Sequence, residues 1–186
     1  MKCSVFIATS LDGFIARLNG DIDWLPNGES VKEHGYQTLM DSVDVLVMGR
    51  NTFELVLSFD AWPYESKPVI VLSSRPLTLP STVPATVEVL QQSPDQLIKT
   101  LEARGAKHIY VDGGVTIQRF IAAGLIDRII ITRIPVLIGS GIPLFGKLPH
   151  DVTLKHVATR AFASGLVQSE YNIATVPGAT AYDATT

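Results

Sequence analysis

Three polar turns, each following a short β-branched run, are the feature that most constrains the fold of this chain. They lie in VLVMGRNTF at 45–53, VIVLSSRPL at 69–77 and IYVDGGVTI at 109–117. Runs of this kind are typical of strands that are buried on both faces. When such strands alternate with helices they predict a parallel sheet, and ligands of such a sheet bind beyond the carboxyl ends of its strands.

The first part of the chain follows this alternation. The expected strands lie at 3–9, 44–48, 69–72, 87–90 and 107–111, and the expected helices at 29–43, 51–57, 94–104 and 115–123. A loop over 10–28 precedes the first helix. The clearest helix has Ser93 as N-cap, Pro94 at its first position and Gln96 completing a capping box, and it ends at Gly105.

The pattern changes after Gly124. Residues 127–138, 152–162 and 166–174 predict strands with no helix between them, and the last two form a hairpin. The run 139–143 ends in proline and predicts a structural loop. The fold class is therefore α/β, with a mixed, mainly parallel sheet that is flanked by helices and ends in antiparallel strands.

Length and composition fit one cytoplasmic domain. The chain has 186 residues, of which 46% are hydrophobic, and can bury one core, so we expect a single domain over 1–175 and a disordered tail over 176–186. The net charge of −3 gives no general attraction to nucleic acid or lipid. Cys3 is the only cysteine, and we recognise neither a signal peptide nor a membrane span.

The turn after the second expected strand has groups suited to a phosphate. Gly49 ends the strand, Asn51 or Thr52 can cap the following helix, and Arg50 adds a positive charge. A plain helix entry with a solvated arginine explains the same residues without a ligand.

The other two turns are similar in kind. Ser73, Ser74 and Arg75 could hold a terminal phosphate monoester, which would select NADP over NAD, although an ordinary turn has the same composition. The pair Gly113-Gly114 allows the backbone to approach a dinucleotide, but glycine pairs are also common in tight turns. Since all three turns are expected at the carboxyl edge of one sheet, together they favour a dinucleotide site.

Four segments occur in an order and spacing typical of one family. They are ATSLDGFIA at 8–16, DVLVMGRNTF at 44–53, PVIVLSSRP at 68–76 and the long segment at 109–145. These segments resemble the dihydrofolate reductase superfamily, and more closely its branch that contains the riboflavin-biosynthesis reductase domain and stand-alone dihydrofolate reductase-like proteins. The resemblance covers about residues 3–174 and implies a mixed eight-stranded sheet with an NADPH site across its carboxyl edge.

The resemblance also implies which residues contact the coenzyme. Those near the nicotinamide lie in the first segment, and those near the phosphates lie in the three polar turns. The set consists of Ala8, Ile15, Gly49, Arg50, Asn51, Thr52, Ser73, Ser74, Arg75, Gly113, Gly114, Val115 and Thr116.

Four further residues are candidates for contact with the substrate or for proton transfer. Asp112 lies where the riboflavin-pathway reductases have a glutamate, and Glu33 is nearest to the position of the carboxylate that pairs with pterin in dihydrofolate reductases. Trp24 could cover the substrate ring, and Asp12 could contact it. Each has an ordinary alternative: a helix cap for Asp112, a solvated helix residue for Glu33, a loop anchor for Trp24 and a turn for Asp12.

The sequence therefore predicts an NADPH-dependent reductase that transfers hydride to a heterocyclic or sugar-like small molecule, such as a pterin or an aminopyrimidinone. The alternative is a nucleotide-binding regulatory or structural protein that has lost turnover. No metal-binding motif is present, and no metal is expected. The apolar run at 129–138 offers more strand surface than one small domain readily covers, so we also expect a homodimer.

Overall fold

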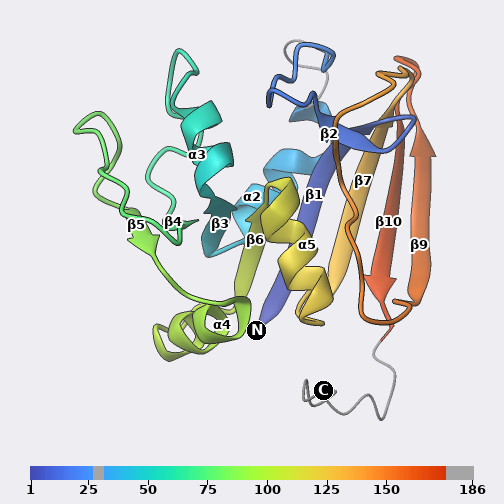
Figure 1. Cartoon of the computed structure of the whole chain (residues 1–186). Helices are drawn as coiled ribbons and strands as arrows, with labels where there is room; N and C mark the ends of the chain where they lie inside the picture. Colours follow the sequence, from blue (N-terminus) through green and yellow to red (C-terminus); the bar gives the residue numbers. More distant parts are fainter. Residues whose placement is uncertain (27–31, 175–186) are drawn as a thin grey trace.

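Ten strands and five helical segments make up the part of the chain that the computed structural model describes, residues 1–26 and 32–174 (Figure 1). The strands are β1 Lys2–Ser10, β2 Phe14–Ala16, β3 Val45–Gly49, β4 Val69–Leu72, β5 Val87–Leu90, β6 His108–Asp112, β7 Arg128–Ile134, β8 Ile142–Pro143, β9 Leu154–Ala161 and β10 Val167–Ile173. The helical segments are η1 Lys32–Tyr36, α2 Gln37–Ser42, α3 Arg50–Val56, α4 Pro94–Ala103 and α5 Gly114–Ala122.

The main sheet has eight strands in the order β5-β4-β3-β6-β1-β7-β10-β9. Every pair from β5 to β7 is parallel, and β10 is antiparallel to both of its neighbours. The mixed sheet ending in antiparallel strands is therefore confirmed. From β3 the chain continues to β4, on the side of the sheet that ends in β5. From β6 it passes β1 and continues to β7, on the side that ends in β9. The neighbouring strands β3 and β6 are therefore followed by connections that run in opposite directions along the sheet. Ligands of open α/β sheets bind at such a point.

The two faces of the sheet carry separate hydrophobic cores. On one face α4 and α5 pack their apolar residues, such as Leu101 and Phe120, against the strands. On the other face α2 and α3 contribute residues such as Leu39 and Phe53. α3 and α5 follow neighbouring strands and cover opposite faces, so their first residues border a crevice at the carboxyl edge of the sheet.

The best-defined helix of the sequence is confirmed in detail. The Ser93 hydroxyl accepts a hydrogen bond from the Gln96 N–H at 3.3 Å, and the Gln96 side chain accepts one from the Ser93 N–H at 3.0 Å. Pro94 occupies the first turn, and Leu97 and Leu101 are buried. Local capping rules were sufficient here because every contact lies within one turn of the chain.

Four expected elements differ in the structure. The helix expected over 29–43 has a break at Gly35, whose φ of 92° lies outside the helical region, and its residues 29–31 lie outside the described part. The expected loops at 10–28 and 139–143 contain β2 and β8, which pair with each other. The strand expected over 127–138 ends at Ile134, because Pro135 follows it.

The tail expected over 176–186 lies outside the described residues. Within the part that the structure does describe, each helix is too short or too polar to cross a membrane.

Candidate functional site

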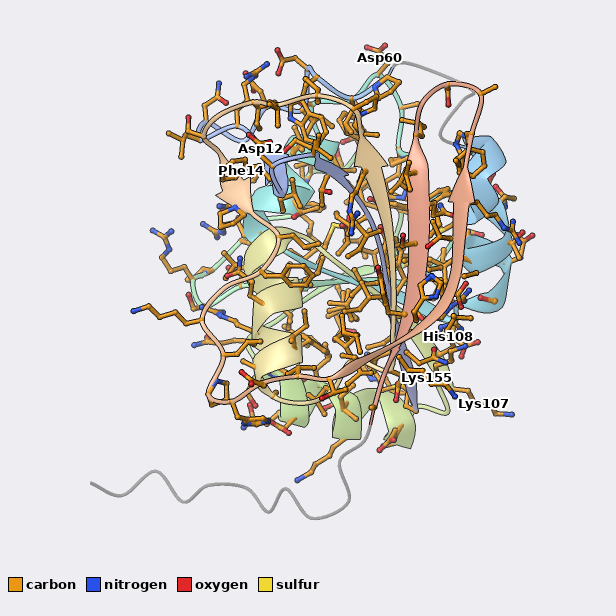
Figure 2. All side chains as sticks on the ribbon, turned by 90° about the vertical axis from the view of Figure 1, so that its right-hand side faces the viewer. Asp12, Phe14, Asp60, Lys107, His108 and Lys155 are labelled. Atoms are coloured by element: carbon orange, nitrogen blue, oxygen red, sulfur yellow. The ribbon has the colours of Figure 1, made fainter. Side chains whose placement is uncertain are left out.

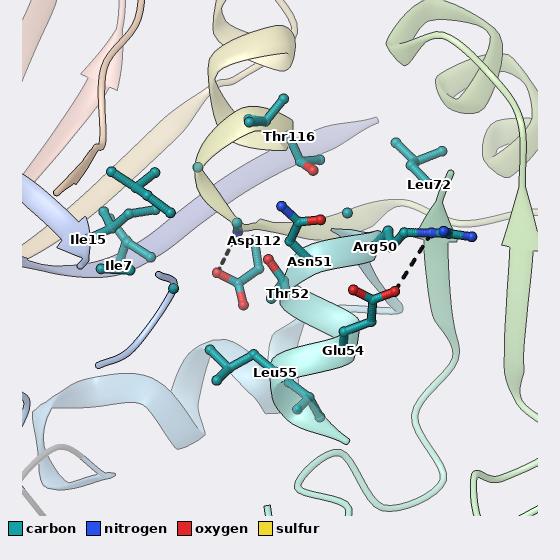
Figure 3. Close-up of a pocket in the computed structure, with 18 of the residues that line it drawn as sticks. Ile7, Ile15, Arg50, Asn51, Thr52, Glu54, Leu55, Leu72, Asp112 and Thr116 are labelled. Atoms are coloured by element: carbon teal, nitrogen blue, oxygen red, sulfur yellow. Dashed lines mark hydrogen bonds and ion pairs between the residues drawn. The ribbon is translucent and has the colours of Figure 1, made fainter. Parts of the chain in front are cut away.

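A cavity of about 1200 Å³ runs along the carboxyl edge of the sheet (Figure 3). It extends from Gln91 and Gln92, after β5, to Thr132 and Ile134 on β7. Every residue that the resemblance implies for the coenzyme lines this cavity, and so does Asp112. The fold therefore brings together turns that are far apart in the sequence, while contact with a coenzyme stays a prediction.

The starts of α3 and α5 approach each other closely across this cavity. A Cβ atom at Gly49 would lie 2.7 Å from the Thr116 hydroxyl, and one at Gly113 would collide with the Thr52 side chain. Gly113 also has a φ of 87°, which side chains rarely tolerate. The N-caps of both helices are glycines, and neither start is capped by a side chain, so the expected cap at Asn51 or Thr52 is not formed.

The third glycine of the site brings the first loop onto the cavity wall. A Cβ atom at Gly114 would lie 2.7 Å from the Ile15 side chain and 3.3 Å from that of Ile142. Ile15 lies in β2 and Ile142 in β8, so this short sheet packs directly on the start of α5. A larger residue at this position would have to displace the end of the Ile15 side chain.

The end of β4 carries the polar groups expected for a phosphate monoester. The Arg50 guanidinium donates hydrogen bonds to the carbonyl oxygens of Arg75 and Pro76, which ties α3 to this turn. The Ser73 hydroxyl donates to the Arg75 carbonyl at 2.6 Å and accepts from the Arg75 N–H at 3.3 Å. The Nε atom of Arg50 is buried and has no hydrogen-bond partner among the described residues.

Asp112 lies at the end of β6, at the centre of the cavity. Burial raises the pKa of its carboxyl to about 6, although the hydrogen bond that it accepts from the Gly113 N–H at 2.8 Å opposes the shift. Tyr110 precedes it on the same face of the strand, and its hydroxyl donates to the Phe6 carbonyl at 2.9 Å. A carboxyl group with this pKa can both hold and release a proton near neutral pH.

Three of the expected substrate or catalytic residues are not placed at the cavity. The Asp12 carboxylate accepts hydrogen bonds from the N–H groups of Ile138 and Gly139, at 3.2 and 2.8 Å. Asp12 therefore ties the first loop to the loop after β7, close to Phe14 (Figure 2). Trp24 is absent from the cavity lining, whereas its neighbours Ile22 and Leu25 are present. The side chain of Glu33 lies outside the described part of the structure.

Comparison with known proteins identifies the family. Residues 2–168 match the RibD C-terminal domain. The chain belongs to this family. The uncharacterized protein YwjB of Bacillus subtilis (strain 168) is 34% identical over 172 residues, which cover 91% of this chain and 97% of that protein.

Solved structures agree with the fold. A protein of Shewanella sp. PV-4, provisionally named for riboflavin biosynthesis, is 43% identical, with a TM-score of 0.86 and coverage of 94% of this chain and 99% of that one. A Thermotoga maritima deaminase and 5-amino-6-(5-phosphoribosylamino)uracil reductase is 16% identical, with a TM-score of 0.66. The match covers 93% of this chain and 56% of the Thermotoga maritima chain.

Sequence reasoning missed the aromatic part of this cavity. Phe6, Tyr36, Tyr64 and Tyr110 all line the cavity. They lie on four different elements or loops, and no motif joins them. Only Tyr110 carried a usable signal, because it stands two residues before Asp112 and therefore on the same face of the strand.

Proposed function

We propose that this protein is an NADPH-dependent reductase that transfers hydride to a heterocyclic or sugar-like small molecule, such as a pterin or an aminopyrimidinone. The observation that carries the proposal is the single cavity, which joins phosphate-type groups at the end of β4 to the enclosed carboxyl of Asp112. The family supports it, and the Thermotoga maritima relative is named as a reductase of a pyrimidine derivative.

The residues present fit a dinucleotide. Gly49 and Gly113 let the starts of α3 and α5 pack against each other, with Thr116 and Thr52 in the space that side chains would fill. Neither start is capped by a side chain, so their backbone N–H groups could bind a pyrophosphate. A phosphate on the ribose would contact Ser73, Ser74 and Arg75. The guanidinium of Arg75 can donate two parallel hydrogen bonds to such a group. The buried Nε of Arg50 lies 3.9 Å from the Glu54 carboxylate and donates no hydrogen bond among the described residues, so it could donate one to such an anion.

For the hydride transfer itself, the chain has to position the coenzyme and substrate and supply a proton. NADPH, when bound, supplies the hydride. Ala8 and Ile15 would hold the nicotinamide end of the cavity, and Ile15 would exclude water because it packs on Gly114. Asp112 would donate a proton to the acceptor, since its raised pKa keeps part of the population protonated near neutral pH.

Binding and turnover can be tested separately. NADPH binding is measured by the change in its fluorescence on addition of protein, and turnover by loss of NADPH absorbance with a panel of pterins, aminopyrimidinones and simple carbonyls. With the preferred substrate, Asp112→Asn should lower kcat at least tenfold and leave the Kd for NADPH within twofold. Binding of NADPH without turnover of any compound would favour the alternative of a regulatory nucleotide-binding protein.

A further inference from the structure

The charged residues of the cavity are distributed unevenly. Among the described residues that line it, the cationic side chains are those of Arg50, Arg75 and Arg119. Arg50 points away from Asp112 toward the end of β4, where it binds the carbonyls of Arg75 and Pro76 (Figure 3). Arg119 lies on α5, at an exposed position on the opposite face of the sheet from α2 and α3.

The other half of the cavity is aromatic. We call Phe6, Tyr36, Tyr64 and Tyr110 the aromatic wall. The ring of Tyr36 lies edge-on to those of Phe6 and Tyr110, with centroids 5.7 and 6.4 Å apart. The hydrophobic side chains of Leu25, Leu55 and Val56 continue this lining.

The aromatic wall surrounds one carboxylate and presents hydroxyl groups. Asp112, Tyr36 and Tyr64 line the same cavity. Burial chiefly, and the charge of Asp112 to a smaller extent, raises the pKa values of both phenols. Neither hydroxyl is hydrogen-bonded within the part of the chain that the structure describes, whereas that of Tyr110 is held by the Phe6 carbonyl. The polar groups that the aromatic wall and its neighbour Asp112 present to a ligand thus include one carboxylate and two phenol groups.

These groups favour one class of molecule and disfavour another. Aromatic faces bind flat rings by stacking and attract electron-poor or cationic ones. A carboxylate accepts hydrogen bonds from ring N–H and amino groups. A phosphate group would enter a partly enclosed space beside the Asp112 carboxylate, where no described side chain of the aromatic wall could neutralise it, so its transfer from water would be unfavourable.

We propose that the substrate is a planar nitrogen heterocycle without a phosphate group, which stacks on the aromatic wall with its N–H groups against Asp112. This assignment rests on the proposed function, because it takes the phosphate-type groups at β4 to be occupied by the coenzyme. It sets this protein apart from the Thermotoga maritima relative, whose name specifies a phosphorylated pyrimidine derivative.

A matched pair of ligands tests the assignment. The probes are 6-hydroxymethylpterin and its phosphate monoester, which share one ring and differ only in the phosphate. Binding of each to the full chain saturated with NADP⁺ is followed by quenching of the pterin fluorescence. We expect the alcohol to bind at least tenfold more tightly than the ester. An ester that binds as tightly or more tightly overturns the proposal.

Two variants identify the cause of the preference. Asp112→Asn removes the charge beside the aromatic wall and should reduce the ratio of the two Kd values. Asp60→Asn removes an exposed carboxylate that lies outside the cavity and should leave the ratio unchanged. If both variants alter the ratio equally, general charge and not the aromatic wall causes the preference, and the proposal is wrong.

The remaining outcomes separate this inference from the proposed function. If NADP⁺ binds but neither pterin does, the planar-ring assignment is overturned and the coenzyme site stands. If NADP⁺ does not bind, the proposed function fails, and the same pair is titrated against the coenzyme-free protein. A tenfold preference for the alcohol there still supports the inference, and any smaller preference overturns it.

Discussion

The role proposed for Asp112 would conflict with the stability of the fold. Asp112 lies at the carboxyl end of a buried strand, where burial raises the pKa of its carboxyl to about 6. One hydrogen bond from the Gly113 N–H offsets part of this cost. A group that destabilises the fold in its charged form is typical of a functional site, because packing alone would favour a neutral side chain.

The sign of this effect gives a stability prediction. The folded pKa is raised from 3.8 to about 6, so the contribution of the protonated carboxyl to stability is complete below pH 3.8 and is lost as the pH rises through 6. Asp112→Asn should therefore be more stable than the parent above pH 6, by up to about 3 kcal/mol, and the difference should shrink toward pH 4. Urea unfolding at several pH values measures it.

A matched acid provides the control for this prediction. The Asp44 carboxylate accepts hydrogen bonds from the N–H groups of Lys107 and His108, which lower its pKa. Its contribution is present above the unfolded pKa and is lost as the pH falls, so Asp44→Asn should destabilise the protein at neutral pH. If the two asparagine variants respond to pH in the same direction, the environment assigned to Asp112 is wrong.

We expect Arg75 to determine which coenzyme is preferred. If its guanidinium contacts the 2′-phosphate, Arg75→Ala should weaken binding of NADPH by about 1–3 kcal/mol and leave NADH nearly unchanged. Titration of both coenzymes by fluorescence measures the difference. Arg104 pairs with Glu88 at the surface and lies outside the cavity lining. Arg104→Ala is therefore the control, and it should change the affinity for neither NADPH nor NADH. Equal losses for NADPH and NADH in Arg75→Ala would contradict the assignment.

At the scale of elements, the site depends on how closely α5 approaches β2. Gly114→Val should abolish detectable NADPH binding, because its side chain would displace Ile15 and Ile142 from the cavity wall. Gly114 is a better test than Gly113, whose positive φ would add backbone strain to any substitution. Far-UV circular dichroism and thermal unfolding establish that the variant is folded. Unchanged NADPH affinity in a folded variant would show that the glycine pair serves only the turn.

The elements that sequence predicted well are those whose causes are local. The strand that ends at Gly49 and the strand that ends at Asp112 are short β-branched runs followed by turn residues, and α4 contains its own caps. Their order then placed the polar turns on one edge, since parallel strands share a carboxyl end. These features, together with the family resemblance, were sufficient to predict the fold and the grouping of the three polar turns on one cavity. Coenzyme contact by these turns stays a prediction.

The elements that sequence missed depend on distant partners. β2 is three residues long and exists because it pairs with β8, more than a hundred residues later. The helix breaks at Gly35, which adopts a left-handed conformation. The helical pattern on both sides of this residue gave no sign of the break. Asp12 contacts the backbone at residues 138–139, so its role as a loop tie could not be read from a local Asp-Gly turn.

For the whole molecule, the structure changes the reason for expecting a dimer. The isoleucines of β7 are covered within one protomer, as Ile129, Ile130, Ile131 and Ile134 are each no more than 7% exposed. The uncovered strand is β9, at the edge of the sheet, where nearly all side chains are exposed. The opposite edge, β5, is only four residues long. A long exposed edge strand is a site for association.

We expect a homodimer in which β9 of one copy packs against the same strand of a second copy. Light scattering should then give about twice the monomer mass of 20.2 kDa at micromolar concentration. Val157 lies in β9 and is 47% exposed, and Val157→Asp should yield monomers because it places a charge in the contact. Leu137, 69% exposed in the loop after β7, is the control, and Leu137→Asp should remain dimeric. A monomer mass for the parent chain would refute the dimer. If Leu137→Asp is monomeric and Val157→Asp remains dimeric, the contact involves the run at 129–138 and not β9.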